Sequence, residues 1–370
     1  MTDIPYENEK AKRDFLEQLL GARGFTKGSI LVFAGAIAKW QLFTGNEDFA
    51  NFNKMKATAF VEWLETKSSK TPTGKIAIVT RYNYLRRVKK FFEWLSDQPG
   101  YKSKMAKGDI EYLRLSKKDT RIARQSTTKK IPTFEEIRKL IEGIEIKNEI
   151  DMRDRALICF AFTVGARISA IITLKMKSFD KQEKVIDQNP ADGVKTKSSK
   201  RILCTFFPLG WDDPERYFVE WYEYLESKSF GPDDPIFPTT QNDLETGESA
   251  YSRGTIGTDF WSSSGSARKI LQKRYLSAGM PYYHPHSFRN LAVAIVSKKR
   301  LTEEEKKAVS LNLGHEDVAT TFGSYGYGNM TANEAIRIVK SLKNSQGEHK
   351  DGSLTEEELR VFRDILARNK

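Results

Sequence analysis

The sequence contains few cysteines and no long apolar run. Cys159 and Cys204 are its only cysteines, and two are too few for a disulfide framework or a structural zinc site. No stretch approaches the uninterrupted apolar length that spans a bilayer. No apolar run of the signal-peptide type follows the first ten residues either. These absences exclude a disulfide-stapled secreted domain and an integral membrane protein, and they predict a soluble, cytoplasmic protein.

Positive charge exceeds negative charge in this chain. The 370 residues include 61 lysines and arginines against 49 acids, which gives a net charge of +12 and a pI of about 9.4. This sign favours a polyanion such as nucleic acid as a partner, although basic soluble proteins are common and charge alone does not decide. With 11% aromatic residues the chain can bury a core, and its length is enough for two domains.

The first third of the chain has the apolar periodicity of helices. Apolar residues recur every three or four positions over residues 27–43, 57–65 and 77–96. The third segment also carries bases that almost no acid interrupts: Arg81, Arg86, Arg87, Lys89 and Lys90. Each base alone is best explained as part of a solvated helix surface. Together they predict a DNA-binding stripe, since several bases on one helix neutralise several phosphates at once.

A polar, basic segment separates this helical region from the rest. Residues 114–130 contain few large apolar groups, which predicts an interdomain linker or a segment that lies along a DNA backbone. Thr133 and Glu136 follow at the spacing of a capping box, so a new helix and a second domain are expected to begin there.

The second domain has a mixed pattern. An apolar helix is predicted over residues 151–164, and Gly165 is a natural C-terminal cap for it. The other expected elements are a short helix over 168–174, strands over 184–187 and 201–207, a helix that opens at Asp213-Pro214, a long loop over 242–266, and helices over 267–277 and 332–342. This order predicts an all-α domain followed by an α+β domain of mostly helices with a small antiparallel sheet.

Three of the four histidines share one segment with an arginine and a tyrosine. They are His284, His286 and His315, and the segment also contains Arg289 and Tyr325. Arginine donates planar hydrogen bonds to phosphate oxygens two at a time. Tyrosine is one of the few side chains that form a covalent intermediate at a reacting centre. The segment therefore predicts attack on a phosphodiester without a metal.

A metal site is the alternative explanation for these histidines. No acidic cluster lies beside them in the sequence, both cysteines are distant, and Pro285 fixes the backbone between the first two. The sequence therefore predicts neither a metal nor a cofactor.

Four motifs, in this order, resemble those of the tyrosine recombinase (phage-type integrase) family. They are Thr163-Val-Gly-Ala-Arg167-Ile-Ser, Thr196-Lys197-Ser-Ser-Lys-Arg, Pro285-His286-Ser-Phe-Arg289, and Leu313-Gly-His315 followed by Thr320-Thr321 and Tyr325. Each motif alone is weak because short patterns recur by chance, but four in order at sensible separations are specific. The resemblance extends over residues 29–342, most strongly in the second domain.

The resemblance implies how the phosphate is held and attacked. Arg167 and Arg289 match the family's arginine clamp on the non-bridging oxygens, where negative charge grows during attack. His315 matches a donor to one of those oxygens. Tyr325 matches the nucleophile, which becomes linked to the 3′ end of the cut strand.

The resemblance also implies two proton transfers. A phenol with a pKa near 10 needs help to lose its proton, and His286 is the candidate general base. Lys197 is the candidate general acid for the departing 5′ oxygen. Lys195 and Lys200 lie in the same turn and are its rivals for that role.

The sequence departs from the family pattern at three places. Tyr325 follows His315 by ten residues, one more than in many members, and Tyr327 is a rival nucleophile two residues further on. Ala170 stands where many members carry an acid, and Asn290 stands where histidine is frequent. None of these changes removes a reacting group.

The resemblance implies a domain plan. Residues 1–113 match a SAM-like helical core-binding domain, residues 131–345 match a catalytic domain, and the two close on DNA as a clamp. Residues 346–370 read as a tail helix, which in the family often docks on a neighbouring protomer of a homo-tetramer.

The implied function is site-specific recombination of double-stranded DNA. Two strand-exchange steps would pass through a covalent 3′-phosphotyrosine and a Holliday junction, without metal or ATP. A type IB topoisomerase-like relaxing enzyme shares the chemistry and stays open as an alternative. A DNA-binding protein with a decayed active site is the other alternative, and the complete set of six reacting groups argues against it.

Overall fold

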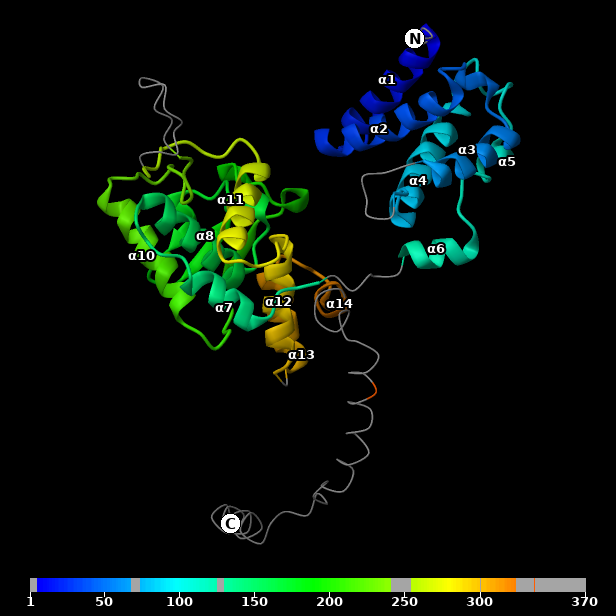
Figure 1. Ribbon diagram of the computed structural model, residues 1–370. Helices are drawn as coiled ribbons and strands as arrows, with labels where there is room; N and C mark the ends of the chain where they lie inside the picture. The colour runs from blue at the N-terminus through cyan, green and yellow to red at the C-terminus, as the bar shows by residue number, and fades with distance from the viewer. Residues whose placement is uncertain are drawn as a thin grey trace, which may run out of the picture. The chain divides into compact units, whose positions relative to one another are not determined.

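The chain divides into two compact units (Figure 1), residues 1–127 and residues 128–370. The computed structural model describes residues 5–67, 74–124, 130–240, 254–299 and 301–323, together with residue 336. Each unit has its own hydrophobic core.

Unit 1 is helical throughout its described residues. Its elements are α1 (Tyr6–Gly21), α2 (Lys27–Thr44), a 3-10 turn (Phe49–Asn51), α3 (Lys54–Thr66), α4 (Ile78–Leu95), α5 (Lys107–Ile110) and α6 (Lys117–Arg124). The three helices predicted from the apolar periodicity are confirmed as α2, α3 and α4. Side-chain caps at Thr26 and Asn53 set the start of α2 and of α3. Helices α1, α5 and α6 are not predicted by the apolar periodicity.

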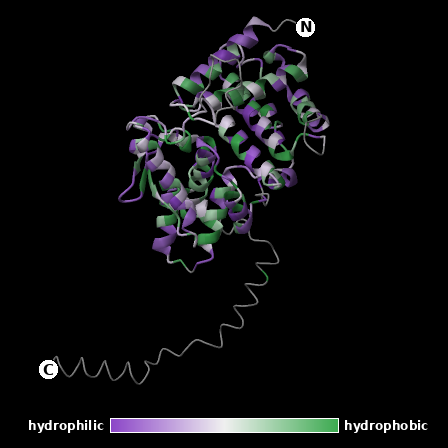
Figure 2. Ribbon diagram, turned by 60° about the vertical axis from the view of Figure 1, so that its left-hand side comes forward, coloured by the Kyte–Doolittle hydropathy of each residue, from purple (hydrophilic) through white to green (hydrophobic). Residues whose placement is uncertain are grey.

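Aromatic side chains fill the core of unit 1. The ring of Trp40 on α2 lies 4.8 Å from that of Phe92 on α4 and 5.0 Å from that of Phe60 on α3. All three side chains are buried. Each such pair contributes about 0.5–1.5 kcal/mol beyond its burial, so Trp40 ties three helices together. Hydrophobic and hydrophilic residues both occur along the helices of the two units (Figure 2).

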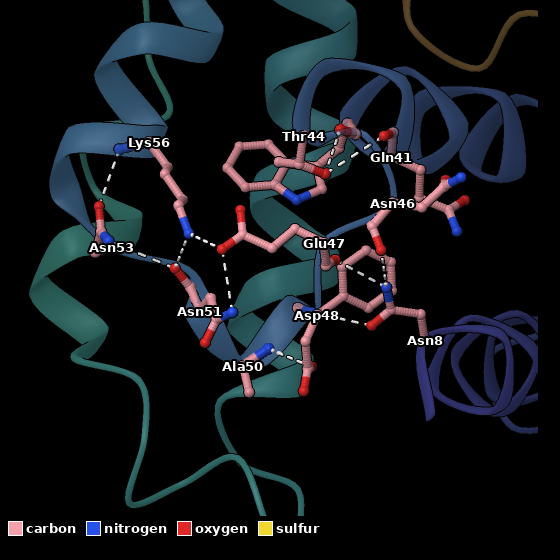
Figure 3. Close-up of polar contacts among 12 residues, drawn as sticks. Asn8, Gln41, Thr44, Asn46, Glu47, Asp48, Ala50, Asn51, Asn53 and Lys56 are labelled. Atoms are coloured by element: carbon pink, nitrogen blue, oxygen red, sulfur yellow. Dashed lines mark hydrogen bonds and ion pairs between the residues drawn. The ribbon is translucent and has the colours of Figure 1, made fainter. Parts of the chain in front are cut away.

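A polar cluster joins α1 to the connection between α2 and α3 (Figure 3). Asn8 is fully buried, and its Nδ2 donates to the carbonyl oxygen of Glu47 at 2.9 Å. Its Oδ1 accepts from the amide of Phe49 at 2.9 Å. Lys56 on α3 pairs with the Glu47 carboxylate. Because a buried amide is stable only when it is hydrogen-bonded, Asn8 holds this connection against α1.

The segment expected to be a linker contains α6. Ser116 accepts from the amide of Asp119 at 3.0 Å and so caps the start of the helix. Ala123 is buried, and Nε of Arg124 donates to the hydroxyl of Tyr82 on α4 at 3.0 Å. At least residues 117–124 therefore pack on α4 within unit 1 and do not form an extended connection.

Unit 2 contains helices around a three-stranded sheet. Its helices are α7 (Phe134–Glu142), α8 (Glu149–Val164), α9 (Ile168–Ile171), α10 (Asp213–Ser227), α11 (Ser264–Ser277), α12 (His286–Ser297), α13 (Glu303–Asn312) and α14 (Val318–Thr321), with 3-10 turns η2 (Met176–Ser178), η3 (Pro190–Asp192) and η4 (Lys197–Ser199). The capping box at Thr133 and Glu136 is confirmed at the start of α7. The short helix after Arg167 ends at Ile171, earlier than residue 174. Part of the loop expected over 242–266 lies outside the described residues. The helix expected over 332–342 lies outside them except for residue 336.

The sheet is small and antiparallel, as predicted. Its strands β1 (Phe179–Asp180), β2 (Val185–Gln188) and β3 (Ile202–Thr205) lie in that order. Ile186 pairs with Phe179 on one side and with Cys204 on the other, and all three side chains are buried. The expected strands correspond to β2 and β3, whereas the two-residue β1 was not anticipated. The connection between β2 and β3 carries η4 and its lysines.

Helix α8 is the centre of unit 2. All of its residues from Ala156 to Val164 are buried, and it packs against α10 and α12. It ends at Gly165, whose φ of +65° is the left-handed conformation predicted for this cap. No helix among the described residues is long and apolar enough to cross a membrane.

Gly314 is required by both its backbone and its surroundings. Its φ is +71°, and a Cβ built on it would lie 2.4 Å from Cδ1 of Ile202 on β3. Only glycine allows the chain to turn this close to the sheet. The turn places His315 directly after α13.

Replacing Gly314 by alanine is therefore expected to destabilise unit 2 by roughly 2–5 kcal/mol, from left-handed strain plus overpacking. Gly193 is the matched control, because its φ is +89° but nothing lies within 4 Å of a built Cβ. Gly193→Ala should cost only about 1–2 kcal/mol of strain. Urea denaturation of the two variants measures the difference, and equal losses would contradict the close approach to Ile202.

Candidate active site

Three of the predicted site residues meet at one point of unit 2. Arg167 is the N-cap residue of α9, Arg289 lies in the first turn of α12, and His315 follows α13. Nε2 of His315 lies 2.7 Å from Nη2 of Arg289 and 3.4 Å from Nη2 of Arg167. The fold thus brings together side chains from three separate segments.

Arg289 is held by backbone carbonyls. Its side chain is buried, with Nη1 donating to the carbonyl oxygen of Gly165 at 2.9 Å and Nη2 donating to that of Leu313 at 2.7 Å. Both carbonyls lie at turns, where a glycine in the left-handed conformation frees them from helical hydrogen bonding. The two bonds fix the plane of the guanidinium before any ligand arrives.

His315 is neutral and has a defined tautomer. Guanidinium nitrogens only donate, so Nε2 must be the unprotonated, accepting nitrogen. The proton then lies on Nδ1, which is 2.9 Å from Oγ1 of Thr321. Burial and the positive charges of Arg289, Arg167, Lys197 and His286 lower the pKa of His315 to about 4.

Lys197 lies in an exposed turn near this cluster. It is the first residue of η4, where the following Ser198 and Ser199 have φ values of +59° and +51°. Its charge is among those that lower the pKa of His315. Its rival Lys200 is paired with Glu316, with Nζ 2.7 Å from Oε1. The other rival, Lys195, donates its backbone amide to Thr173 at 2.9 Å.

His286 begins α12, one helical turn before Arg289. Its backbone amide lies 3.2 Å from Nδ1 of His284, and its charge also acts on His315. Residues three apart lie on the same face of a helix, so His286 and Arg289 are neighbours. Tyr325 and its rival Tyr327 lie outside the described residues.

The contact made by Thr321 is not predicted by the sequence. Thr320 and Thr321 belong to the fourth motif, but the motif implies no role for either residue. Thr321 is fully buried, whereas Thr320 is exposed. Ala170 and Asn290, two of the three departures from the family pattern, both have buried side chains.

A basic groove runs along unit 1. It has a volume of about 750 Å³ and lies between α4, the segment before α6, and α6 itself. One acid, Glu93, lies among its basic lining residues, which are Arg86, Lys89, Lys90, Arg114, Lys117, Arg121 and Arg124. Three of the five predicted DNA-binding residues therefore share this groove. Four bases of residues 114–130, the segment predicted to be a linker or to lie along a DNA backbone, join them.

The other predicted DNA-binding residues, Arg81 and Arg87, do not line the groove. Nη1 of Arg81 lies 3.0 Å from Oε1 of Glu65 on α3, and the pKa of Arg87 is lowered, chiefly by burial. Within the described residues no group of three or more histidine, cysteine or acidic side chains is arranged to hold a metal ion.

Comparison with known proteins assigns the chain to a family. The sequence profile of the phage integrase family matches residues 130–332, a little over half of the chain. The chain therefore belongs to the phage integrase family, the tyrosine recombinases. The tyrosine recombinase XerC of Lactobacillus delbrueckii subsp. bulgaricus is 25% identical over 322 residues, which cover 84% of this chain and 92% of the relative. XerC of Escherichia coli O157:H7 is 23% identical over 332 residues, covering 87% and 91%.

Solved structures share the fold. A lambda integrase tetramer bound to a Holliday junction aligns with a TM-score of 0.58 at 12% identity, covering 87% of this chain and 78% of that chain. The XerH recombinase bound to a palindromic difH substrate gives a TM-score of 0.54 at 18% identity, covering 87% and 81%. The Tn1549 transposon integrase with transposon right end DNA gives 0.55 at 12% identity, covering 90% and 99%.

The lowered pKa of His315 predicts a pH dependence of stability. The folded pKa, about 4, lies below the ordinary value of 6.5, so the unfolded state binds more protons between these values. The stability that comes from keeping His315 neutral is fully present above pH 6.5 and is lost as the pH falls toward 4. The free energy of unfolding should fall by on the order of 3 kcal/mol over this range. The urea midpoint of the wild type should therefore fall between pH 6.5 and pH 4, and it should fall less steeply in His315→Gln, which has no group that titrates at this position. An unchanged pH slope in the variant would show that His315 titrates normally.

Proposed function

We propose that this tyrosine recombinase cuts and rejoins double-stranded DNA at specific sites through a covalent 3′-phosphotyrosine, without metal or ATP. The observation that carries the proposal is the convergence of Arg167, Arg289 and His315 on one point. Membership of the phage integrase family supports it. Recombination between two sites would proceed through a Holliday junction.

Arg167 and Arg289 would bind the non-bridging oxygens of the scissile phosphate. Attack on phosphorus builds negative charge on these oxygens, and cations fixed in advance stabilise it most effectively. The two carbonyl contacts of Arg289 supply such fixing. His315 would donate to one of the same oxygens.

Tyr325 would be the nucleophile. Its phenol oxygen bonds to phosphorus and the bond to the 5′ oxygen breaks, so the phosphodiester energy is kept in the phosphotyrosine. His286 would accept the phenol proton, and Lys197 would give a proton to the departing 5′ oxygen. Attack by a 5′ hydroxyl of the partner strand reverses these steps and reseals the DNA.

Unit 1 would hold the DNA backbone. A groove with seven bases and one acid suits successive phosphates, whose neutralisation supplies much of DNA affinity. We propose that residues 1–113 together with α6 form the core-binding domain, that the linker is the part of residues 114–130 outside α6, and that residues 131–345 form the catalytic domain. Helix α6 would add its bases to the groove.

The assembly would be a homo-tetramer on DNA. The lambda integrase structure that shares this fold is a tetramer bound to a Holliday junction. Residues 346–370, which lie outside the described residues, would dock on a neighbouring protomer. A type IB topoisomerase-like activity would need the same chemistry but no such assembly.

The nucleophile is tested by locating the covalent bond. Duplexes bound by the chain are first selected from fragmented DNA of its source, and a nicked version traps the cleaved strand. Tryptic digestion then yields the peptide of residues 308–337, which contains both tyrosines. Tandem mass spectrometry should place the nucleotide on Tyr325.

Two phenylalanine variants provide the matched comparison. Tyr325→Phe should abolish the adduct, whereas Tyr327→Phe should retain it, because only one phenol attacks. A nucleotide on Tyr327 would reject the assignment of the nucleophile. An adduct that persists in the double variant would exclude both Tyr325 and Tyr327 as the nucleophile.

The general acid is tested by changing the leaving group. Lys197→Ala should slow cleavage by about 10²–10⁴-fold, the range for general acid catalysis. A substrate with sulfur in place of the bridging 5′ oxygen should restore most of the rate, since a thiolate leaves without a proton. Lys200→Ala is the control, because Lys200 is paired with Glu316. If the sulfur substrate restored the cleavage rate of Lys200→Ala and not that of Lys197→Ala, Lys200 would be the general acid in place of Lys197.

A further inference from the structure

Thr321 contacts His315 at the ring nitrogen opposite the two arginines. Oγ1 of Thr321 lies 2.9 Å from Nδ1 of His315, and the threonine is fully buried. It is the last residue of α14, whose start is capped by the Asp317 side chain accepting from the amide of Ala319 at 2.9 Å. The hydroxyl is thus held at the ring by a capped helical turn.

We propose that the Thr321 hydroxyl is a positioning residue that lets His315 move its proton from Nδ1 to Nε2 when the site binds a phosphate. The proposal rests on the proposed function, in which His315 donates to a non-bridging oxygen. It assigns a role to the side of the ring that faces away from the substrate.

The DNA-free protein fixes the starting tautomer. Nε2 accepts from Arg289 at 2.7 Å and faces Arg167 at 3.4 Å, so it carries no proton. Nδ1 therefore carries the proton and donates it to Thr321. This is the less populated tautomer of free histidine in water, so its presence is diagnostic of the contacts.

A bound phosphate requires the opposite arrangement. Nε2 must then carry a proton in order to donate, so it can no longer accept from Arg289 or Arg167. The N–H groups that face Nε2 would donate to the phosphate oxygens instead, while the two carbonyl contacts of Arg289 stay in place. In the Nε2–H tautomer Nδ1 becomes an acceptor, and a hydroxyl meets it by rotating its own proton toward the ring. Nδ1 loses one proton to solvent and Nε2 gains one, so the ring stays neutral.

Exchange of tautomer is favoured over full protonation by the charges that face the ring. Arg167 and Arg289 contact His315, and these two arginines, Lys197 and His286 each disfavour the imidazolium. Two arginines and a lysine leave the site with a net positive charge after one phosphodiester charge is added, which still disfavours an imidazolium. A side chain able to accept in one state and donate in the other is therefore needed behind the ring.

The substitution Thr321→Val tests this need. Valine has nearly the same shape but neither donates nor accepts. Nδ1 of His315 therefore loses its hydrogen bond to residue 321 both in the DNA-free and in the phosphate-bound protein. Cleavage of the nicked duplex should slow by roughly ten- to a hundredfold, as expected for one buried hydrogen bond. Affinity for the duplex should stay unchanged, because Thr321 is not expected to touch DNA.

Two variants serve as controls. Thr321→Ser keeps the hydroxyl and should cleave at close to the wild-type rate. Thr320→Val makes the same chemical change at an exposed neighbour and should also behave as wild type. If Thr321→Val fails to fold, the serine variant and the wild-type tautomer still decide the proposal.

The tautomer is read directly by nitrogen-15 NMR of histidine-labelled full-length chain, with His315→Gln assigning the signal. Wild type should show Nδ1–H without DNA and Nε2–H with the nicked duplex. Three results would overturn the proposal: an Nε2–H signal without DNA, an imidazolium with DNA, or wild-type cleavage by Thr321→Val. Failure of the wild type to form any covalent adduct would instead reject the proposed function. The two failures are distinguishable, because the tautomer of the DNA-free protein is measured without substrate and does not depend on cleavage.

Discussion

The buried guanidinium of Arg289 is the interaction on which the site depends. It donates to the carbonyl oxygen of Gly165 at the end of α8 and to that of Leu313 in the turn after α13. It also donates to Nε2 of His315. A guanidinium presents five donors in a fixed plane, so these contacts fix the relative positions of three segments. The group proposed to bind phosphate thus also assembles the centre that contains it.

The second constraint is electrostatic. Arg289 and Arg167 contact His315, and Lys197 and His286 add to their effect, so the pKa of His315 is lowered to about 4 and its ring is neutral at pH 7. Cations brought together in a protein repel one another, and the phosphodiester of the proposed reaction would offset this repulsion. The DNA-free site is thus already shaped for its proposed substrate, which agrees with the idea that catalytic electrostatics are fixed in advance.

Much of the fold could be predicted, because it depends on local rules. The capping box at Thr133 and the glycine after α8 are short-range signals, and both are confirmed. Helix α6 was missed because most of its residues are charged or polar. Ala123 is its one buried residue, so the helix shows no apolar periodicity. Strand β1 was missed because two residues give no periodicity.

The site could be predicted only in part. The order of the motifs identified Arg167, Arg289 and His315, and their meeting at one point agrees with that identification. The roles of the six reacting groups stay predictions, and Tyr325 lies outside the described residues. Thr321 could not have been found from residue type or spacing, since its contact depends on how the turn between α13 and α14 folds back on His315.

The central claim, that the arginines compensate the charge of a scissile phosphate, is tested most directly with a methylphosphonate. This group replaces one non-bridging oxygen by a methyl and removes the negative charge. Loss of Arg167 in Arg167→Ala should slow cleavage of the normal duplex by about 10²–10³-fold. On the methylphosphonate duplex the ratio of wild-type to variant rates should shrink by roughly tenfold or more. An equal ratio on both duplexes would contradict the account.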